Sequence, residues 1–336
     1  MALNLKDEKG IALILTITLI GLIVILTLQF NKSIRTGLYE MINFEDRIKL
    51  GAIAKSGFNC VLAVLQKDDS GVDSLQDDWA KLNQDEISLY SSMLFDDDGV
   101  FRIEATDLAG KIQINRLINT TGEQKGEYNE KQKTILENLL KLKMSDFDLE
   151  EEDIEDILDA IKDWIDEDDE VTGFGAEDSY YQSLEHPYSC RNAPFESIYE
   201  LLLVKGMTPE LFYGTEDETE KIPGISVYLT TYGDGKININ TADDIVLHAL
   251  SEDLDETLIA EMDDYRRDEN NDLSSPDWYK TALGTSGDYI DPALITTKSS
   301  FFEITSVGVR DTGSRGIRGV VRRSGKILTV LSWNTF

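Results

Sequence analysis

The chain has 336 residues, enough for one or two domains with a sizeable core. Its 64 acidic and 32 basic residues give a net charge of −32. Such a surface repels nucleic acid and anionic lipid headgroups and attracts divalent cations and basic partners. The acidic residues are spread through sequence with apolar periodicity, so general disorder is not expected.

The N-terminus combines a charged ten-residue leader with an uncharged apolar run from Ile11 to Phe30. A helix of roughly 20 apolar residues can cross a bilayer. An ordinary signal peptide has its small-residue cleavage site after the apolar core, whereas Gly10 lies before it. This arrangement resembles the signal of type IV pilins and type II secretion pseudopilins. The resemblance implies cleavage between Gly10 and Ile11 by a prepilin peptidase, and N-methylation of Ile11. The alternative is a plain signal anchor.

The predicted N-terminal helix continues beyond the apolar run. Apolar residues recur at steps of three and four, which is typical of one buried helix face. We expect the second half of this helix to pack on a globular domain through Ile34, Leu38, Met41, Phe44, Ile48, Phe58, Val61 and Leu65.

Strand patterns flank a long, mostly helical stretch that ends near residue 296. After a turn at Asp96 to Gly99, VFRIEATD alternates like a strand, and KIQIN (Lys111 to Asn115) follows as a second short strand. Three C-terminal strands are predicted in SFFEITSVGVRD, GIRGVVRRS and KILTVLSW. This order predicts an α+β fold in which an insertion leaves and rejoins one antiparallel sheet.

A short internal repeat lies within this stretch. LAGKIQINRL and GDGKININTA share a GKI-x-IN core, and Asn240 or Thr241 is predicted to cap a helix beginning near Ala242. The second copy resembles the helix-hairpin-helix edge of DNA-binding modules, including membrane-tethered DNA receptors. The acidic Asp243 and Asp244 that follow would repel phosphate. Between the two copies, GTEDETE (Gly214 to Glu220) is predicted to be a mobile loop.

No catalytic motif is recognisable. The two histidines, His186 and His248, have no obvious nucleophile beside them, and nucleophile-elbow, zinc-protease, phosphate-loop and dinucleotide signatures are absent from the sequence. A non-enzymatic role is therefore expected. A calcium-dependent hydrolase would need a reacting group that the sequence does not offer.

The densest group of oxygen ligands begins in DWIDEDDE and continues past two glycines. Calcium takes six to eight hard oxygen ligands, and an acidic glycine-bearing loop can wrap around one ion. The spacing does not match an EF-hand, and acidic runs are more often solvated or cap helices. The calcium candidates are Asp163, Asp166, Asp168, Asp169, Glu177 and Asp178, with Asp268 to Asp272 as a weaker second loop.

The two cysteines leave two interpretations open. Cys60 and Cys190 could form a disulfide in an oxidising envelope, or Cys60 could be a buried residue of an apolar helix.

The stretch from Asp163 to Phe212, with GKININTA and the C-terminal strands, resembles the K-type minor pseudopilin of type II secretion. This resemblance implies a type IV pilin-like fold with a large helical insertion of helix-hairpin-helix or SAM-like character. It also implies bound calcium and no enzymatic activity. The implied partners are the I-type and J-type minor pseudopilins and the major pseudopilin fibre, which this subunit would cap.

The predicted organisation follows from that resemblance. Residues 1–10 are the leader, 11–30 the membrane-spanning part of the helix, 31–115 with 297–336 the pilin-like domain, and 116–296 the insertion. The expected location is the inner membrane, with the C-terminal domain in the periplasm, and no nucleic acid is expected. The alternative is a membrane-tethered helix-hairpin-helix module, such as a DNA-uptake receptor, or another minor pilin.

Leu15 occupies the fifth position after the predicted cleavage site, where the family usually has Glu. In pilin-like fibres that Glu pairs with the N-terminal amine of a neighbouring subunit. An unpaired carboxylate in an apolar environment is costly. A tip subunit has no subunit ahead of it, so we interpret Leu15 as a tip signature.

Overall fold

The computed structural model describes residues 8–68, 71–82, 99–216, 221–310 and 313–336. The first seven residues of the predicted leader, the turn at 96–98 and residues 217–220 of the predicted acidic loop lie outside this part.

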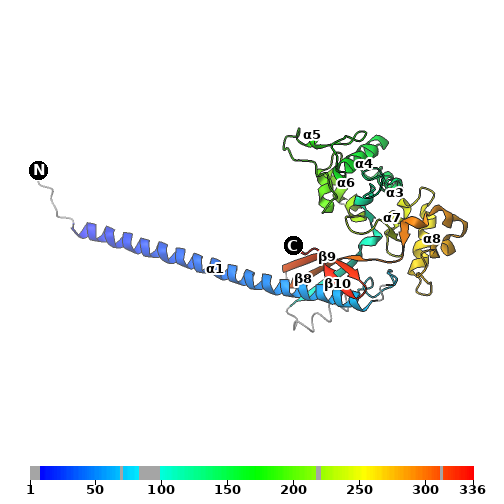
Figure 1. Ribbon diagram of the computed structural model, residues 1–336. Coiled ribbons are helices and arrows are strands. Elements are labelled where there is room, and N and C mark those ends of the chain that lie inside the picture. The colour runs from blue at the N-terminus through cyan, green and yellow to red at the C-terminus, as the bar shows by residue number, and fades with distance from the viewer. Residues whose placement is uncertain (1–7, 69–70, 83–98, 217–220, 311–312) are drawn as a thin grey trace.

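Helix α1 (Glu8–Lys67) has 60 residues and is therefore about 90 Å long. Figure 1 shows its N-terminal half projecting away from a folded body that sits on its C-terminal end. Within the described residues, α1 is the one helix that is long and apolar enough to cross a membrane.

The apolar face of α1 is covered over only part of its length. Burial of its apolar side chains against the folded body begins at Leu50, which is 5% exposed. The prediction that Ile34 to Ile48 pack on the globular domain is wrong, since Met41 and Phe44 are 69% and 65% exposed. Periodicity shows that a helix face is apolar but not which surface covers it. This segment projects beyond the sheet, so its apolar face is free to contact another molecule.

The main sheet has the order β1-β8-β9-β10, with every pair antiparallel and β11 also paired to β9. Its first strand and its three long C-terminal patterns are as predicted. Asp107 at the end of β1 lies opposite Phe302 near the start of β8, so the chain leaves and rejoins the sheet at the same end of two neighbouring strands. The strands are β1 (Val100–Asp107), β8 (Phe301–Arg310), β9 (Gly313–Ser324), β10 (Ile327–Val330) and β11 (Asn334–Thr335).

The C-terminal part of α1 packs closely on one face of this sheet. Alternation along the strands places Phe101, Ile103, Phe302 and Ile304 on that face, where they form a core with the helix. Gly57 permits the close approach, because a Cβ there would lie 2.4 Å from Ser306 Oγ.

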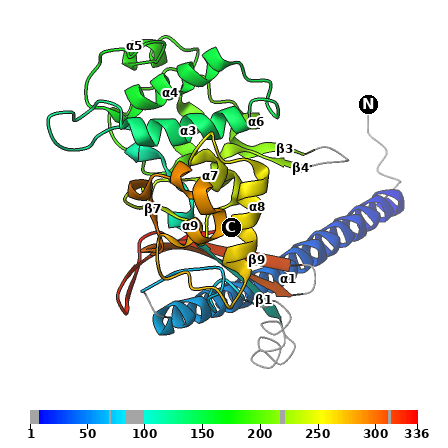
Figure 2. The ribbon, with the colours of Figure 1, turned by 90° about the vertical axis from the view of Figure 1, so that its right-hand side faces the viewer.

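The chain between β1 and β8 forms a mostly helical insertion with a separate hydrophobic core (Figure 2). Its α-helices are α3 (Glu130–Leu142), α4 (Glu151–Ile165), α5 (Asp178–Tyr181), α6 (Pro209–Tyr213), α7 (Asp244–Ala249), α8 (Glu256–Arg267) and α9 (Trp278–Leu283). Its 3-10 helices are η1 (Leu108–Gly110), η2 (Ile114–Arg116), η3 (Ile198–Leu203), η4 (Ile225–Tyr228), η5 (Gly284–Tyr289) and η6 (Pro292–Leu294). Its short strands are β2 (Ile112–Gln113), β3 (Gly214–Glu216), β4 (Lys221–Pro223), β5 (Leu229–Thr230), β6 (Ile237–Asn238) and β7 (Ile295–Thr296).

The predicted strand KIQIN is not part of the main sheet. Only Ile112 and Gln113 are extended, and they pair in parallel with β5 of the insertion. The turn η1 redirects the chain after Asp107, so Ile112 and Ile114 pack in the insertion core.

The two GKI-x-IN copies have related structures. Each begins with a two-residue strand in a parallel pair, β2 with β5 and β6 with β7. In each copy the asparagine that ends the shared core, Asn115 or Asn240, is buried and hydrogen-bonds to main-chain groups. The predicted cap is wrong by two or three residues, because Asp243 rather than Asn240 or Thr241 accepts from the helix, at Ile245 N.

The predicted loop from Gly214 to Glu220 begins as strand β3, which pairs with β4. Gly214 has a φ of +90°, and a Cβ there would lie 2.1 Å from Ile222 O. The glycine therefore allows this tight hairpin to form.

Candidate metal centre

The acidic residues of the predicted calcium loop lie at and after the end of α4. Asp163 is in its last turn, and Asp166 is its C-terminal cap with extended backbone angles. The chain then passes through an irregular loop to Glu177, the N-terminal cap of α5. Asp163, Asp166 and Glu177 are 0%, 2% and 2% exposed, so the acidic run is not simply a solvated surface.

Three of the six candidates converge. One carboxylate oxygen from each of Asp166, Asp168 and Glu177 lies within 4.8 Å of the others. Because Ca–O distances are about 2.3–2.6 Å, oxygens on opposite sides of one ion can be about 5 Å apart. The spacing of these three groups is therefore compatible with a single shared calcium ion.

Several oxygens of the converging carboxylates lack hydrogen-bond partners within the described protein, although Asp168 Oδ1 accepts from Glu170 N at 2.9 Å. Asp166 Oδ1 and both carboxylate oxygens of Glu177 are buried and accept no hydrogen bond. Burial raises the pKa of Glu177 to about 7, and the charges of Asp163, Asp166 and Asp169 add to this effect. Burial also raises the pKa of Asp166 to about 6, although Lys162 Nζ lies 3.2 Å from its Oδ2 and opposes the shift. Unpartnered buried carboxylates are costly, so a bound cation would relieve a real electrostatic penalty.

The other three candidates accept hydrogen bonds from the surrounding loop. Both oxygens of Asp163 accept from Thr172 N, at 3.0 and 3.2 Å. Asp169 Oδ1 accepts from Asn192 Nδ2 at 3.0 Å, and Asp178 Oδ1 accepts from Cys190 N at 3.0 Å. Asp163, Asp169 and Asp178 therefore position the loop rather than converge with the first three groups.

The backbone at Gly175 passes close to the carboxylate of Asp163 on α4. A Cβ at Gly175 would lie 2.1 Å from Asp163 Oδ2. The glycines of the acidic tract thus allow the chain to pass close to the helix end.

Asn192 belongs to the site but was not predicted. Its Nδ2 donates to Asp168 O at 2.8 Å, and its Oδ1 is buried without a hydrogen-bond partner. Its φ of +46° is a conformation that Asn tolerates better than most residues. Nothing in the local sequence indicates that residue 192 returns to a loop 24 residues earlier.

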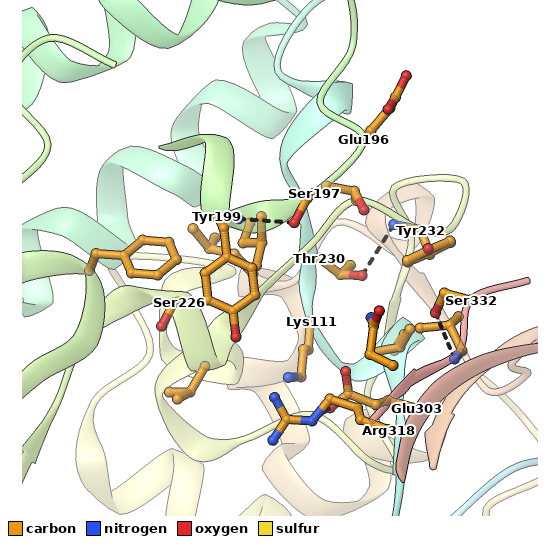
Figure 3. Close-up of a pocket in the computed structure, with 18 of the residues that line it drawn as sticks. Lys111, Glu196, Ser197, Tyr199, Ser226, Thr230, Tyr232, Glu303, Arg318 and Ser332 are labelled. Carbon is orange, nitrogen blue, oxygen red and sulfur yellow. Dashed lines mark hydrogen bonds and ion pairs between the residues drawn. The ribbon is translucent and has the colours of Figure 1, made fainter. Parts of the chain in front are cut away.

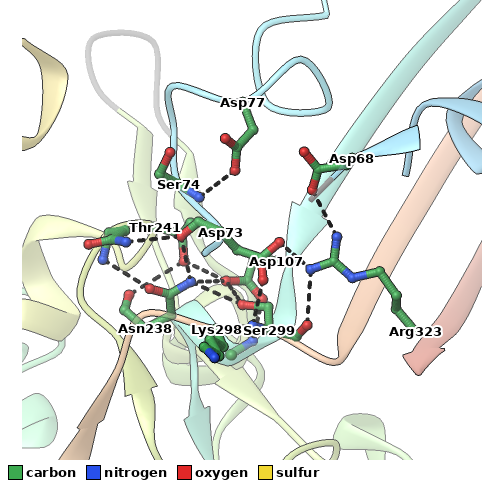
Figure 4. Close-up of polar contacts among 12 residues, drawn as sticks. Asp68, Asp73, Ser74, Asp77, Asp107, Asn238, Thr241, Lys298, Ser299 and Arg323 are labelled. Carbon is green, nitrogen blue, oxygen red and sulfur yellow. Dashed lines mark hydrogen bonds and ion pairs between the residues drawn. The ribbon is translucent and has the colours of Figure 1, made fainter. Parts of the chain in front are cut away.

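A second acidic cluster lies where the insertion meets the sheet. Carboxylate oxygens of Asp68, Asp73 and Asp77 also lie within 4.8 Å of one another. This cluster already contains a cation, because Arg323 pairs with Asp68 Oδ2 at 2.9 Å and with Asp73 Oδ1 (Figure 4). It therefore does not fit a calcium site in the way that the first cluster does.

Asp107 extends this junction toward the second repeat copy. Its buried carboxylate accepts from Ser299 Oγ at 2.5 Å, Thr241 Oγ1 at 2.6 Å and Asn238 Nδ2 at 2.9 Å (Figure 4). The contacts join the end of β1 to the insertion and to the segment before β8.

The weaker acidic loop does not gather its carboxylates. Asp268 Oδ1 accepts from Asn270 N and Asp272 Oδ1 accepts from Ser274 N, so both groups stabilise turns.

Of the two interpretations left open for the cysteines, the disulfide is not formed, because both cysteines are free. Cys60 lies on α1 and Cys190 lies in the insertion, which have separate cores. The alternative of a buried Cys60 is also wrong, since its side chain is exposed. Cys190 Sγ instead lies 3.7 Å from Asp163 O, beside the first acidic cluster.

Gly10 and Ile11 both lie within α1, near its N-terminal end. Ile11 and Leu15 are 60% and 64% exposed. Cleavage, methylation and the role of Leu15 stay predictions.

Comparisons with known proteins agree with the sequence resemblance. Residues 110–214, which include the whole calcium candidate, match the family described as type II secretion system protein K. Type II secretion system protein K of Aeromonas hydrophila is 28% identical over 212 residues, which are 62% of this chain and 61% of that protein. The predicted family resemblance is confirmed.

The fold is shared with a known K-family assembly. A chain of the crystal structure of the GspK–GspI–GspJ complex from the enterotoxigenic Escherichia coli type 2 secretion system superposes with a TM-score of 0.64 at 19% identity. The match covers 88% of this chain and 98% of the other. The predicted pilin-like α+β fold, with a large helical insertion, is thereby confirmed.

Proposed function

We propose that this chain is a non-enzymatic minor pseudopilin that caps the tip of a type II secretion pseudopilus. In this role it contributes to pseudopilus assembly and to the export of folded proteins. Its partners are the I-type and J-type minor pseudopilins and the major pseudopilin fibre. Its soluble part lies in the periplasm, and its N-terminal helix lies in the inner membrane before assembly.

The uncovered apolar face of α1 is the observation that carries this proposal. About 90 Å of helix is roughly three times the thickness of a bilayer core, so α1 extends well beyond the membrane. Apolar residues such as Leu38, Met41 and Phe44 remain exposed in that outer segment. Contiguous exposed apolar surface marks an interaction site, and neighbouring helices of a fibre would cover it.

The position of the insertion supports the tip assignment. It lies at the end of the molecule opposite the free end of α1 (Figure 1). A large domain at that end would obstruct another subunit stacked ahead of this one. Leu15 fits the same role, because a leading subunit has no subunit ahead whose N-terminal amine could pair with Glu.

Co-purification of the full chain with I-type and J-type minor pseudopilins tests the assignment. We expect a stable complex in detergent, and we expect Met41→Glu or Phe44→Glu to weaken it by placing a charge in the apolar contact. Tyr39→Glu is a control for added charge on another side of the same exposed helix. Failure to bind either partner with calcium present would refute the assignment.

We further propose that the first acidic cluster binds calcium. Asp166, Asp168 and Glu177 would hold the ion, and Asn192 Oδ1 is a fourth oxygen in the same loop region. Buried oxygens without a hydrogen-bond partner on Asp166, Glu177 and Asn192 support a hard cation. When bound, calcium would neutralise the cluster and fix the loop between α4 and α5.

Terbium luminescence and calorimetry on the full chain test this site. We expect Glu177→Gln and Asp166→Asn each to reduce calcium affinity by at least about tenfold, because each removes an ionised oxygen ligand. Glu170→Gln is the matched control, since this exposed residue lies in the same acidic run but outside the converging group. Equal affinities in Glu177→Gln and Glu170→Gln would contradict the assignment.

Cleavage between Gly10 and Ile11, with methylation of Ile11, completes the proposal. Mass spectrometry of the mature N-terminus should find N-methylated Ile11 after co-expression with a prepilin peptidase. Gly10→Val should leave the leader attached, whereas Gly21→Val in the same helix should not prevent cleavage.

A further inference from the structure

A cavity of about 430 Å³ lies between the insertion and the main sheet (Figure 3). Lys111 and Tyr199 line it from the insertion, and Glu303 and Arg318 line it from β8 and β9. Alternation along these strands places Glu303 and Arg318 on the face opposite Phe302 and Ile304, which pack against α1. The cavity therefore opens on the side of the sheet that α1 does not cover.

Two cations face this cavity in a strongly acidic protein. Figure 3 shows the Lys111 amine and the Arg318 guanidinium directed into the same space. Burial lowers the pKa of Lys111, and the nearby Arg318 charge acts in the same direction. No ion pair or side-chain hydrogen bond of Lys111 occurs within the described residues, and Arg318 reaches Glu303 only at 3.9 Å.

The acidic residues at the cavity do not fully neutralise the positive charge of Lys111 and Arg318. Glu196 also lines the cavity, but its side chain is 82% exposed and pairs with Arg191 at 2.7 Å. Glu303 faces both cations: its carboxylate lies 3.9 Å from Arg318 Nε, and its charge raises the pKa of Lys111 against the effect of burial. A carboxylate that entered between Lys111 and Arg318 would gain two charge-assisted hydrogen bonds.

Exposed aromatic side chains surround the two cations. Tyr199 and Tyr213 line the cavity and are 53% and 57% exposed. From the sheet side, the Phe336 ring is 63% exposed and lies 5.6 Å from the Arg318 guanidinium. Tyr and Arg are the residue types that dominate binding energy at protein interfaces. The combination suits a peptide segment with an acidic residue between apolar ones.

We propose that this cavity binds a Glu or Asp side chain of an extended segment, flanked by apolar residues, in an exported protein. The source of the segment rests on the proposed secretion function. Fibre subunits that join through α1 would contact the opposite face of the sheet and leave the cavity accessible. A cavity of this volume admits a side chain and its neighbours rather than a folded domain.

Fluorescence polarisation with capped pentapeptides tests the site on the full chain in detergent with calcium. The probes carry Glu between pairs of Phe, Leu and Val residues, and a matched set carries Gln instead. We expect the Glu set to bind about tenfold more tightly, and Lys111→Met or Arg318→Gln to remove that preference. Arg322→Gln is the control, because Arg322 is an exposed residue on the same strand and face but does not line the cavity.

Equal binding of the Glu and Gln sets would overturn the proposal, as would a Glu preference that survives both substitutions. Circular dichroism checks that the variants fold, and Arg318→Gln tests the site if Lys111→Met does not. Loss of peptide binding in a preformed complex with I-type and J-type partners would assign the cavity to a subunit contact and refute the exported-protein source. Failure to form that complex, with peptide binding retained, would refute the pseudopilin assignment instead.

Discussion

Two clusters of three carboxylates each differ in how their negative charge is balanced. Asp68, Asp73 and Asp77 converge as closely as Asp166, Asp168 and Glu177 do. The guanidinium of Arg323 from β9 pairs with Asp68 and Asp73. Buried oxygens of Asp166 and Glu177 have no hydrogen-bond partner within the described residues. A cluster of carboxylates therefore indicates a metal site only after the protein's own cations have been located.

The two clusters should also contribute differently to the stability of the protein with and without a bound cation. The Arg323 cluster, which we call the junction cluster, joins α1 and β9 to the segment before β8 through Asp68, Asp73 and Ser299. The Glu177 cluster, which we call the loop cluster, lies in the insertion after α4. We expect the junction cluster to stabilise the protein by itself, and the loop cluster to do so only when a cation is bound.

The largest expected effect comes from removing the cation of the junction cluster. Arg323→Met should reduce the free energy of unfolding by about 3–5 kcal/mol near pH 8, because it leaves Asp73 buried and unpaired. Urea unfolding of the calcium-loaded protein measures this change. Arg322→Met, at the exposed neighbouring position, should change it by less than about 0.5 kcal/mol. A small loss in Arg323→Met would show that the pair is dispensable.

The second prediction is that removing one carboxylate changes the free energy of unfolding in opposite directions in the two clusters. Without calcium, Asp73→Asn should destabilise the protein, since the buried Arg323 would keep only the partly exposed Asp68 as a charged partner within the described residues. Glu177→Gln should instead stabilise the calcium-free protein by about 1 kcal/mol above pH 7, because it removes an unpaired buried charge. Urea unfolding in chelator measures both variants. Destabilisation of similar size in both would mean that Lys162, whose Nζ lies 3.2 Å from Asp166 Oδ2, already neutralises the loop cluster.

Calcium should remove the greater stability that Glu177→Gln has over the wild-type protein in chelator. A ligand at about 100 times its Kd stabilises the folded state by about 2.7 kcal/mol. We expect the wild-type protein to gain this amount and Glu177→Gln to gain little of it. Thermal unfolding with and without calcium, with Glu170→Gln as control, measures the gain.

The third prediction concerns pH. The pKa of Asp166 is raised to about 6 and that of Glu177 to about 7, so the folded calcium-free protein holds more protons than the unfolded chain between about pH 4 and 7. Stability contributed by these groups is therefore fully present below about pH 4 and is lost as pH rises through 6 and 7. Each pKa unit corresponds to about 1.4 kcal/mol.

Calcium should oppose this loss, because protons and calcium compete for the same oxygens. Calcium affinity should rise between pH 5 and 7 and then level off. Urea unfolding at a series of pH values, with and without calcium, provides the measurement. A pH dependence that Glu177→Gln leaves unchanged would assign the effect to other groups, such as Asp73, whose pKa is also raised to about 6.

The sequence predicted what local patterns determine. Alternation identified β1 and the long C-terminal strands, and residue type with glycine spacing located the loop cluster. The contacts between distant segments were not predictable: Arg323 lies 250 residues from Asp73, and Asn192 returns to Asp168 through a loop. Local pattern also misplaced the apolar face at Leu38 and Met41, since periodicity does not distinguish a surface covered by the same chain from one left for a partner.

The smallest effect is a change in thiol reactivity beside the loop cluster. Burial raises the pKa of Cys190 to about 12, so little thiolate forms at neutral pH, whereas Cys60 is exposed. Maleimide should label Cys60 much faster, with Cys60→Ser isolating the slow reaction of Cys190. Calcium should slow it further, because Cys190 N donates to Asp178 Oδ1 and its thiol contacts Asp163 O, which places it within the segment that the ion would fix. Calcium-independent labelling of Cys190, in a protein that binds the ion, would show that the loop is equally ordered without it and that only its charge balance changes.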